Sequence, residues 1–257
     1  MKIPYGISDF ESLRKEGYLY VDKTDFISRL EDIGGKYLFF IRPRRFGKSL
    51  FLSTLAHYYD LNNREQFKDL FGDLYIGKNP TELRNKYIIM KLNFSSLNTD
   101  SKEKLYFSFK ESISQTIIAN IIKYKKLFTN YQDIINKLEK LEDIKSILNL
   151  YIEKIKEINK KVYLIIDEYD HFANDIIAMG DGDFYKEIIR ATGFVRDFYE
   201  TVKIGTESVI DRVFITGISP VMLDDLTSGF NIATNITLNK LTNEMLGFTE
   251  DEVMGII

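Results

Sequence analysis

The feature that most constrains the fold is the run from Tyr37 to Ile41, five hydrophobic residues without a polar interruption. A strand can be hydrophobic at every position only when both faces of its sheet are covered, which is the situation in parallel sheets. Hydrophobic residues at helical spacing follow over residues 48–61. The same alternation continues along the chain, so we predict an α/β fold with a mostly parallel sheet and right-handed crossovers.

Four other short runs have strand length, and helical patterns lie between them. The five predicted strands cover residues 37–41, 87–92, 162–166, 213–216 and 235–238. Further helices are predicted from Leu105 to Ile121, from Ile134 to Ile155 and from Phe184 to Val202. Ligands bind beyond the carboxyl ends of parallel strands, and the chemistry is therefore expected there.

The first predicted strand is followed by Arg42-Pro-Arg-Arg-Phe-Gly-Lys-Ser49 and then by a helix. This order matches the second half of the phosphate-binding pattern G-x-x-x-x-G-K-[ST], with Arg42 in place of its first glycine. Gly47 lets backbone N–H groups close on an anion, and the helix N-terminus faces the same point. We expect Lys48 to reach the β- and γ-phosphates and the Ser49 hydroxyl to bind Mg²⁺.

The predicted nucleotide contacts follow the loop and the start of the helix, with one residue from the fourth strand. They are Arg44, Arg45, Phe46, Gly47, Lys48, Ser49, Leu50 and Thr216. The alternative for the loop is an ordinary basic turn. For Arg42, Arg44 and Arg45, solvated or salt-bridged side chains, phosphate contacts and contacts to a nucleic acid backbone all stay open.

The third predicted strand, 162–166, ends in the acid pair Asp167 and Glu168. Carboxylates after a buried strand usually have a partner or a metal. We expect Asp167 to bind Mg²⁺ and Glu168 to orient or deprotonate the attacking water. Lys48, Asp167 and Glu168 are thus the predicted catalytic residues, and a solvated turn is the alternative. Asp170 is either a helix cap or a further catalytic acid.

Polar residues also follow the fourth predicted strand. Thr216 and Ser219 are candidates for sensing the γ-phosphate, whereas Gly217 and Pro220 are typical of a turn. An arginine is often required near the phosphates during hydrolysis, and it can come from a neighbouring subunit. The candidates for such an arginine, each with a surface salt bridge as the alternative, are Arg190, Arg196 and Arg212.

Composition excludes several other classes. The chain has no cysteine, so disulfides and thiolate metal sites are absent, and its two histidines lack metal-ligand spacing. The net charge of -3 provides no general attraction to nucleic acid. No run approaches the length of a membrane span, and no signal peptide is evident, so we expect a cytoplasmic protein without membrane contact. No Pro/Gly/Ser-rich linker divides the chain, which predicts one domain over residues 1–257.

With these motifs in place, the sequence resembles the AAA-ATPase-like family, a branch of the P-loop NTPases in which arginine commonly occupies the position of Arg42. The matching segments are Pro4–Phe10, Tyr20–Thr24, Arg42–Ser49, Ile165–Asp170, Thr216–Pro220, Leu226–Asn231 and Leu246–Glu250. The resemblance implies a three-layer sandwich with a five-stranded sheet of the additional-strand class. The phosphate-loop strand would lie between the fourth and fifth strands, with a helical insertion at about residues 100–160.

The resemblance also implies that the N-terminal segment, residues 1–35, packs near the nucleotide. Gly6, Ile7 and Phe10 would approach the adenine, and Asp22 to Thr24 would brace the loop. Family members often carry a PD-(D/E)XK nuclease-like domain after the ATPase domain. We expect no such domain within this chain, because its last residues lack the nuclease pattern of carboxylates and lysine.

The function expected from these observations is binding of ATP with Mg²⁺ and its hydrolysis to ADP and phosphate, which drives or times a conformational switch. One alternative is a nucleotide-dependent binding or regulatory module with negligible turnover, acting on nucleic acid with a partner or a nuclease domain. A homo-oligomer or a partner that supplies an arginine fits either reading. A small-molecule phosphotransferase and a nucleic-acid-binding accessory domain are further alternatives.

Overall fold

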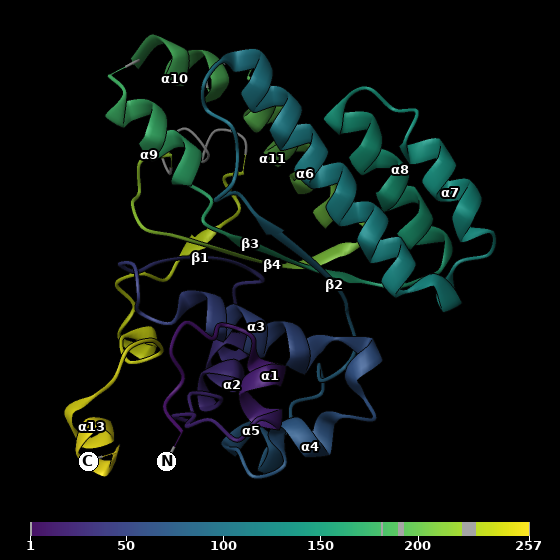
Figure 1. Ribbon diagram of the computed structural model, residues 1–257. Coiled ribbons are helices and arrows are strands. Elements are labelled where there is room, and N and C mark those ends of the chain that lie inside the picture. Colours follow the sequence, from purple (N-terminus) through teal and green to yellow (C-terminus); the bar gives the residue numbers. More distant parts are fainter. Residues whose placement is uncertain (1, 181, 190–192, 223–229, 257) are drawn as a thin grey trace.

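The computed structural model describes residues 2–180, 182–189, 193–222 and 230–256. It contains the predicted parallel sheet, whose strands lie in the order β2-β3-β4-β1-β5 and pair in parallel throughout (Figure 1). The strands are β1 (Tyr37–Ile41), β2 (Ile88–Asn93), β3 (Val162–Asp167), β4 (Ile210–Gly217) and β5 (Thr234–Asn235). The strand that precedes the phosphate loop, β1, lies between β4 and β5, which confirms the predicted sheet class.

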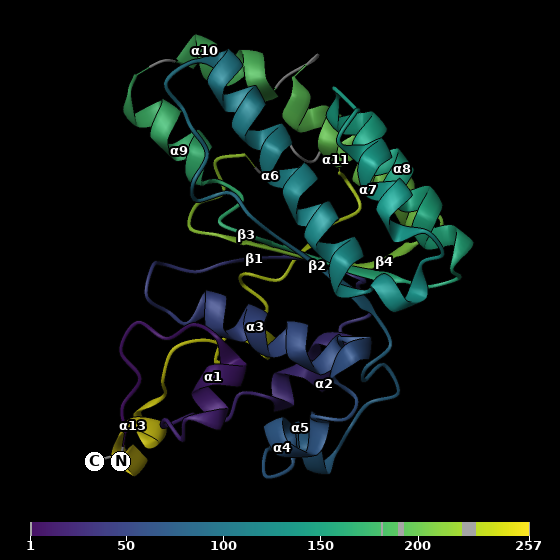
Figure 2. The ribbon, with the colours of Figure 1, turned by 45° about the vertical axis from the view of Figure 1, so that its right-hand side comes forward.

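Helices cover both faces of the sheet and make the fold a three-layer sandwich (Figures 1 and 2). One face carries α1 (Phe10–Lys15), α2 (Asp25–Asp32), α3 (Lys48–Tyr59), α4 (Phe67–Phe71) and α5 (Tyr75–Lys78). The other carries α6 (Lys102–Lys123), α7 (Tyr131–Leu138), α8 (Ile144–Glu157), α9 (His171–Ala178), α10 (Gly182–Ile189) and α11 (Phe194–Thr206). Short 3₁₀ turns lie at Leu61–Asn63, Lys125–Leu127 and Lys240–Thr242.

The alternation of strand side chains explains why the strands are hydrophobic throughout. In β1, Leu38 and Phe40 pack in the core beneath α3, whereas Phe39 packs in the opposite core with α6 and α11. Every residue of β3 is buried. None of the helices in the described part of the chain has the length and hydrophobicity of a membrane span.

Two predicted helices are each interrupted. The predicted helix from Ile134 to Ile155 is divided into α7 and α8. A new helix starts at Ile144 because the Asp143 side chain caps it, accepting a hydrogen bond from the Ser146 N–H. The stripe from Phe184 to Val202 forms α10 and α11, and residues 190–192 between them lie outside the described residues. The same holds for residues 226–229 of one segment that carries the family resemblance.

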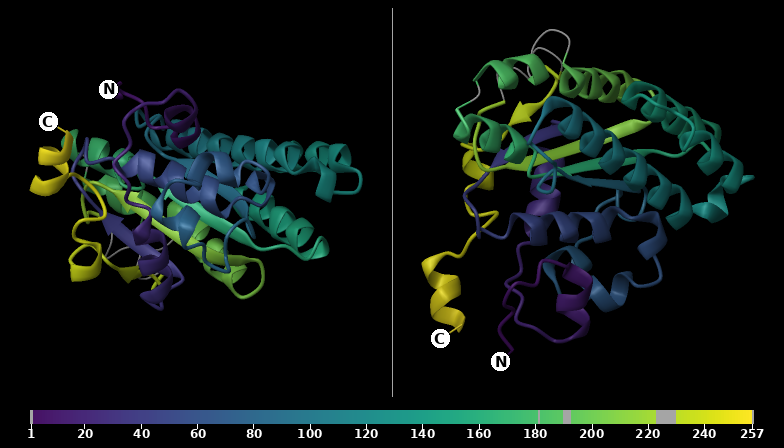
Figure 3. Two further views of the ribbon diagram at one scale, coloured as in Figure 1. Left: turned by 90° about the horizontal axis from the view of Figure 1, so that it is seen from below. Right: turned by 45° about the horizontal axis from the view of Figure 1, so that its top comes forward.

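The fifth strand is shorter than predicted, with two residues instead of four. The Asn235 side chain accepts a hydrogen bond from the Thr237 N–H, which diverts the backbone from the ladder. The segment nevertheless stays beside β1, because Ile236 N–H donates to the Phe39 carbonyl and Ile41 N–H donates to the Thr237 hydroxyl. After it, α13 (Glu250–Ile256) lies on the α3 side of the sheet, near the N-terminal segment (Figure 3).

Candidate phosphate-binding site

The loop of residues 42–47 joins the end of β1 to the start of α3. Two of its residues have left-handed backbone conformations, Arg45 with φ 67° and Gly47 with φ 86°. Gly47 is the N-cap of α3, and its carbonyl accepts the hydrogen bond from Phe51 N–H. A glycine is suited to this position by its conformation rather than by space, because a Cβ there would meet no atom within 4 Å. The helix N-terminus therefore opens toward the loop.

Lys48 is only 6% exposed and has no carboxylate partner in the described structure. Its ammonium donates hydrogen bonds to the carbonyl oxygens of Arg42 and Pro43, each at 2.9 Å. Burial lowers the pKa of Lys48, although the carboxylates of Glu168 and Asp167 act in the opposite direction. The Lys48 ammonium is thus held at the base of the loop by two hydrogen bonds to backbone carbonyls, and an anion could take the place of these acceptors.

Ser49 and Asp167 meet across the site although 118 residues separate them. The Ser49 hydroxyl donates to Asp167 Oδ2 at 2.7 Å, and the Asp167 side chain is almost fully buried. A hydroxyl and a carboxylate are oxygen donors of the kind that Mg²⁺ prefers. In the described ranges, no group of three or more acidic, histidine or cysteine side chains is placed to hold a metal. Oxygens from phosphate and water would therefore have to complete the coordination of an ion at this pair.

Glu168 follows in an unusual conformation, with φ 54°. Left-handed conformations of residues other than glycine are uncommon and often occur at functional sites. Its N–H donates to Asp167 Oδ1 and its carbonyl accepts from His171 N–H, so the backbone is fixed at both ends. Glu168 is partly buried, and its carboxylate receives no hydrogen bond from another described residue.

Asp170 stands at the start of a helix, as one of its two predicted roles requires, but its side chain makes no capping hydrogen bond. It occupies the N-cap position of α9, but its carboxylate accepts hydrogen bonds from the N–H groups of Ile218 and Ser219, the latter at 2.6 Å. The Asn174 amide adds a third donor. The side chain is completely buried. Asp170 therefore connects the end of β3 to the loop that follows β4.

Of the two predicted sensors, the structure leaves one hydroxyl without a partner. Thr216 pairs with Phe40 across the sheet, and its side chain lies on the α3 side with that of Phe214. Its Oγ1 is buried and has no hydrogen-bond partner among the described residues. The Ser219 hydroxyl, in contrast, donates to Asn174 Oδ1. Thr216 is the better candidate for a ligand contact, since a buried hydroxyl is rarely left unpaired.

The arginines of the phosphate loop differ in their surroundings. The Arg42 guanidinium donates to the carbonyls of Ile41 and Thr237 and lies over the Phe40 ring, so it does not point to an incoming phosphate. Arg44 and Arg45 are exposed. Any basic patch for nucleic acid at this loop thus consists of two arginines rather than three.

The arginines proposed for a neighbouring site are engaged or not described. Arg212 does not precede the fourth strand but lies inside β4, where it is 8% exposed among buried tyrosines at the end of the sheet away from the phosphate loop. Arg196 donates to Glu200 on its own helix. Arg190 lies outside the described residues.

A hydrophobic hollow of about 670 Å³ adjoins the phosphate loop. Its walls come from the N-terminal segment, the loop, the first turn of α3 and the chain around α13. They include Ile3, Pro4, Phe46, Leu50, Leu246, Phe248 and Val253. Its volume lies within the range of small-molecule sites. The sequence analysis expected the N-terminal segment near the nucleotide, but it did not single out the side chains of Ile3 and Pro4, which line this hollow.

The N-terminal residues singled out from the sequence have other places. Gly6 and Ile7 do not line this hollow. Phe10 is fully buried in the core and stacks on Phe71. Asp22 and Thr24 brace α5 instead of the loop, since they accept hydrogen bonds from the N–H groups at residues 75 and 76.

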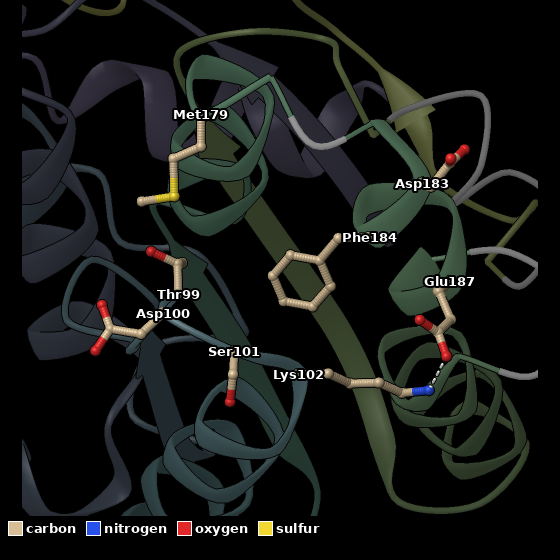
Figure 4. A pocket seen from close by; sticks show the side chains of 8 residues that line it. All are labelled: Thr99, Asp100, Ser101, Lys102, Met179, Asp183, Phe184 and Glu187. Carbon is tan, nitrogen blue, oxygen red and sulfur yellow. Dashed lines mark hydrogen bonds and ion pairs between the residues drawn. The ribbon is translucent and has the colours of Figure 1, made fainter.

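A second hollow, of about 540 Å³, lies between the start of α6 and the helices α9 and α10 (Figure 4). Its acidic residues have lysine partners: Glu187 contacts Lys102, and Asp100 pairs with Lys104. The Phe184 ring occupies its middle in Figure 4. None of the loop or acid residues described above lines it, so it is separate from the candidate site.

Comparison with known proteins gives one family. The family model described as "Predicted AAA-ATPase" matches residues 4–227, which supports nucleotide binding. The chain is also similar to an uncharacterized protein in the vnfD 5' region of Azotobacter chroococcum mcd 1, with 24% identity over 258 residues. That alignment covers 99% of this chain and 44% of the relative, so the chain spans less than half of the relative's length. No solved structure matches.

Proposed function

Since the chain belongs to the predicted AAA-ATPase family, we propose that it binds ATP with Mg²⁺ at the loop of residues 42–49 and hydrolyses it to ADP and phosphate. The observation that carries this proposal is the meeting of Lys48 and Ser49, from the start of α3, with Asp167 at the end of β3. A cation, a hydroxyl and a carboxylate at one helix N-terminus are the groups that a magnesium-bound triphosphate requires.

Binding begins with the phosphates. Lys48 exchanges its two carbonyl acceptors for phosphate oxygens, which are stronger acceptors because they are charged. The N–H groups at the start of α3 and the exposed Arg44 and Arg45 add donors around the loop. The hydrophobic hollow beside Phe46 takes the adenine base, whose planar apolar faces suit walls such as Ile3 and Leu246.

The magnesium ion fits the donor set, because Ser49 and Asp167 present two oxygens at one point. These two residues would hold it, and when bound it would offset the charge of the phosphates. Asp167 is kept in place by its own buried position in β3 and by the Ser49 hydroxyl. This arrangement needs no further protein ligand.

Glu168 acts on the attacking water. Its fixed backbone and unbonded carboxylate suit a group that must orient a water molecule or take its proton. The Thr216 hydroxyl donates to the γ-phosphate or to that water, and this contact would satisfy the buried oxygen. The energy released drives or times a conformational change.

A nucleotide-dependent switch with negligible turnover is the second candidate. It is favoured by one observation: Arg212 is buried near the end of β4 away from the phosphate loop, and Arg196 pairs with Glu200 on its own helix. An arginine from a neighbouring subunit or partner would then be needed for fast hydrolysis. In this second candidate function, the exposed Arg44 and Arg45 would contact a nucleic acid.

The test measures ATP turnover and nucleotide affinity in the presence of Mg²⁺ for the wild type, Lys48→Ala and Glu168→Gln. We expect Lys48→Ala to weaken binding by roughly 30- to 150-fold, the effect of losing about 2–3 kcal/mol of charged hydrogen bonds. Glu168→Gln should keep its affinity and lose about 100-fold or more in turnover. The exposed residues Lys86 and Glu82 provide matched controls, Lys86→Ala and Glu82→Gln.

The outcomes separate the candidates. Turnover in the wild type that is lost in Glu168→Gln supports the ATPase. Binding without turnover in the wild type favours the switch. A wild type that does not bind ATP, or a Lys48→Ala protein that binds as tightly as the wild type, refutes the proposed site.

A further inference from the structure

We propose that Arg42 is a positioning residue for nucleotide binding: its side chain ties the base of the phosphate loop to Thr237 and so sets the place from which Lys48 meets the phosphates. This proposal rests on the proposed function. It concerns the one position at which the loop departs from the pattern G-x-x-x-x-G-K-[ST].

The side chain of Arg42 makes contacts that glycine cannot make. Its Nη1 donates to the carbonyl of Thr237 at 2.8 Å and to its neighbour's carbonyl, that of Ile41, at 3.0 Å. The guanidinium lies 4.4 Å from the centre of the Phe40 ring. Hydrogen bonds from a charged donor are stronger than neutral ones, and stacking on an aromatic face adds to them. The side chain therefore holds two chain segments that are 195 residues apart.

The backbone of Arg42 links the hydrogen bond to Thr237 with the position of the Lys48 ammonium. The Arg42 N–H donates to the carbonyl of Gly217 at the end of β4. The Arg42 carbonyl accepts a hydrogen bond from the Lys48 ammonium. One residue thus touches β4, the segment after β5 and the phosphate-binding lysine. When its side chain is fixed, the carbonyl that holds Lys48 is fixed with it.

The backbone conformation at this position does not require glycine. The left-handed residues of the loop are Arg45 and Gly47, and Arg42 is not among the positions with positive φ. An arginine is therefore accommodated without backbone strain. Glycine at this position would remove the hydrogen bond to Thr237 and increase the backbone flexibility of the loop.

The segment after β5, which accepts the hydrogen bond from Arg42, also contacts the other end of the phosphate loop. Gly247 N–H donates to the Phe46 carbonyl at 3.1 Å. Lys23 also contacts this part of the chain: its ammonium donates to the Glu244 carbonyl and pairs with the Glu252 carboxylate. Residues 237–247 therefore hold the loop at its start and near its end. A loop that is already ordered loses less entropy when it binds, so these ties favour nucleotide affinity.

The experiment compares the wild type with Arg42→Gly, Arg42→Ala and Arg42→Lys. Arg42→Gly restores the usual residue of the pattern, Arg42→Ala separates the missing side chain from the flexibility of glycine, and Arg42→Lys keeps a charged donor. Arg84→Gly is the matched control, because Arg84 lies at the same 4.4 Å over Phe67, on α4 and away from the phosphate loop. Each protein is assayed for its dissociation constant for MgATP, its thermal midpoint and amide hydrogen exchange in residues 236–247.

We expect Arg42→Gly and Arg42→Ala to raise the dissociation constant about tenfold and to speed exchange in residues 236–247, because the preordered loop is lost. Arg42→Lys should recover part of the affinity, which a purely structural role would not predict. Arg84→Gly should leave affinity and exchange unchanged.

Two results would overturn the proposal while leaving the proposed function intact. One is an Arg42→Gly protein that binds MgATP as tightly as the wild type. The other is unchanged exchange in residues 236–247 in Arg42→Gly and Arg42→Ala. A wild type that does not bind MgATP refutes the proposed function itself, and this proposal with it.

Discussion

Gly217 is the residue at which a single methyl group should disturb the site most. A Cβ at this position would lie 2.3 Å from Asp170 Oδ1 and 2.5 Å from Cδ1 of Tyr169. Neither neighbour can move easily. The Asp170 carboxylate is held by the N–H groups of Ile218 and Ser219, and the buried Tyr169 donates its hydroxyl to the Ser219 carbonyl. Gly217 has no positive φ, so the cost of alanine arises from overlap alone.

The magnitude follows from that geometry. Overpacking a well-ordered core usually costs about 1–3 kcal/mol, and a contact more than 1 Å shorter than ordinary van der Waals distance against two fixed groups belongs at the upper end. We therefore expect Gly217→Ala to lower the free energy of unfolding by about 3 kcal/mol. For a chain of this length, that corresponds to a fall of roughly 6–12 °C in the thermal midpoint.

Urea denaturation followed by circular dichroism measures this change, with the slope of the transition as a check that the same surface unfolds. Gly255→Ala is the control, since a Cβ there meets nothing within 4 Å, and helical alanine should be neutral or slightly stabilising. A Gly217→Ala protein within about 0.5 kcal/mol of the wild type would show that Asp170 and Tyr169 give way. The reasoning from their hydrogen bonds would then be refuted.

Two further substitutions test other parts of the structure. Burial acts to raise the pKa of Asp211, but the hydrogen bonds from Lys36 and Tyr87 outweigh it and lower the pKa below its ordinary value of 3.8. The stability that this carboxylate contributes is present above that value and is lost as the pH falls through the lower folded value. Asp211→Asn should therefore cost about 1 kcal/mol at pH 7 and flatten the loss of stability below about pH 4, as measured by urea denaturation across pH; an unchanged acid limb would contradict this. Thr216→Val should raise stability by about 1 kcal/mol, because it removes a buried hydroxyl that has no described partner. It should also slow ATP turnover with nucleotide affinity retained, and a less stable Thr216→Val protein would mean that the hydroxyl is bonded.

The sheet could be predicted because its strands must be hydrophobic on both faces, and runs such as Val162–Ile166 admit no other environment. The phosphate loop and the acid pair Asp167 and Glu168 could be located because their residue types keep a fixed relation to strand ends. The length of β5 could not be predicted. It depends on the Asn235 side chain capturing the Thr237 N–H, a local competition that periodicity does not reveal.

The partners within the site were also beyond sequence reasoning. Asp170 could be a cap or a catalytic acid, and only the approach of the loop after β4, 48 residues later, shows that it binds Ile218 and Ser219. Arg42 likewise has its acceptor at Thr237, which is brought near by the pairing of β5 with β1. Such contacts follow from strand order, and the order of strands in space differs from their order along the chain.

That difference in order governs when the site can first exist during synthesis. The phosphate loop leaves β1 and the acid pair ends β3, and the strand that separates them in the sheet is β4, which begins only at Ile210. A growing chain that has not yet reached β4 has both halves of the site but nothing to set the distance between them. Lys48 and Asp167 can take their places only after a late strand inserts between two earlier ones, which is a pairing of long sequence separation and therefore intrinsically slow. The two halves of the candidate site are thus brought together only once β4 has joined the sheet.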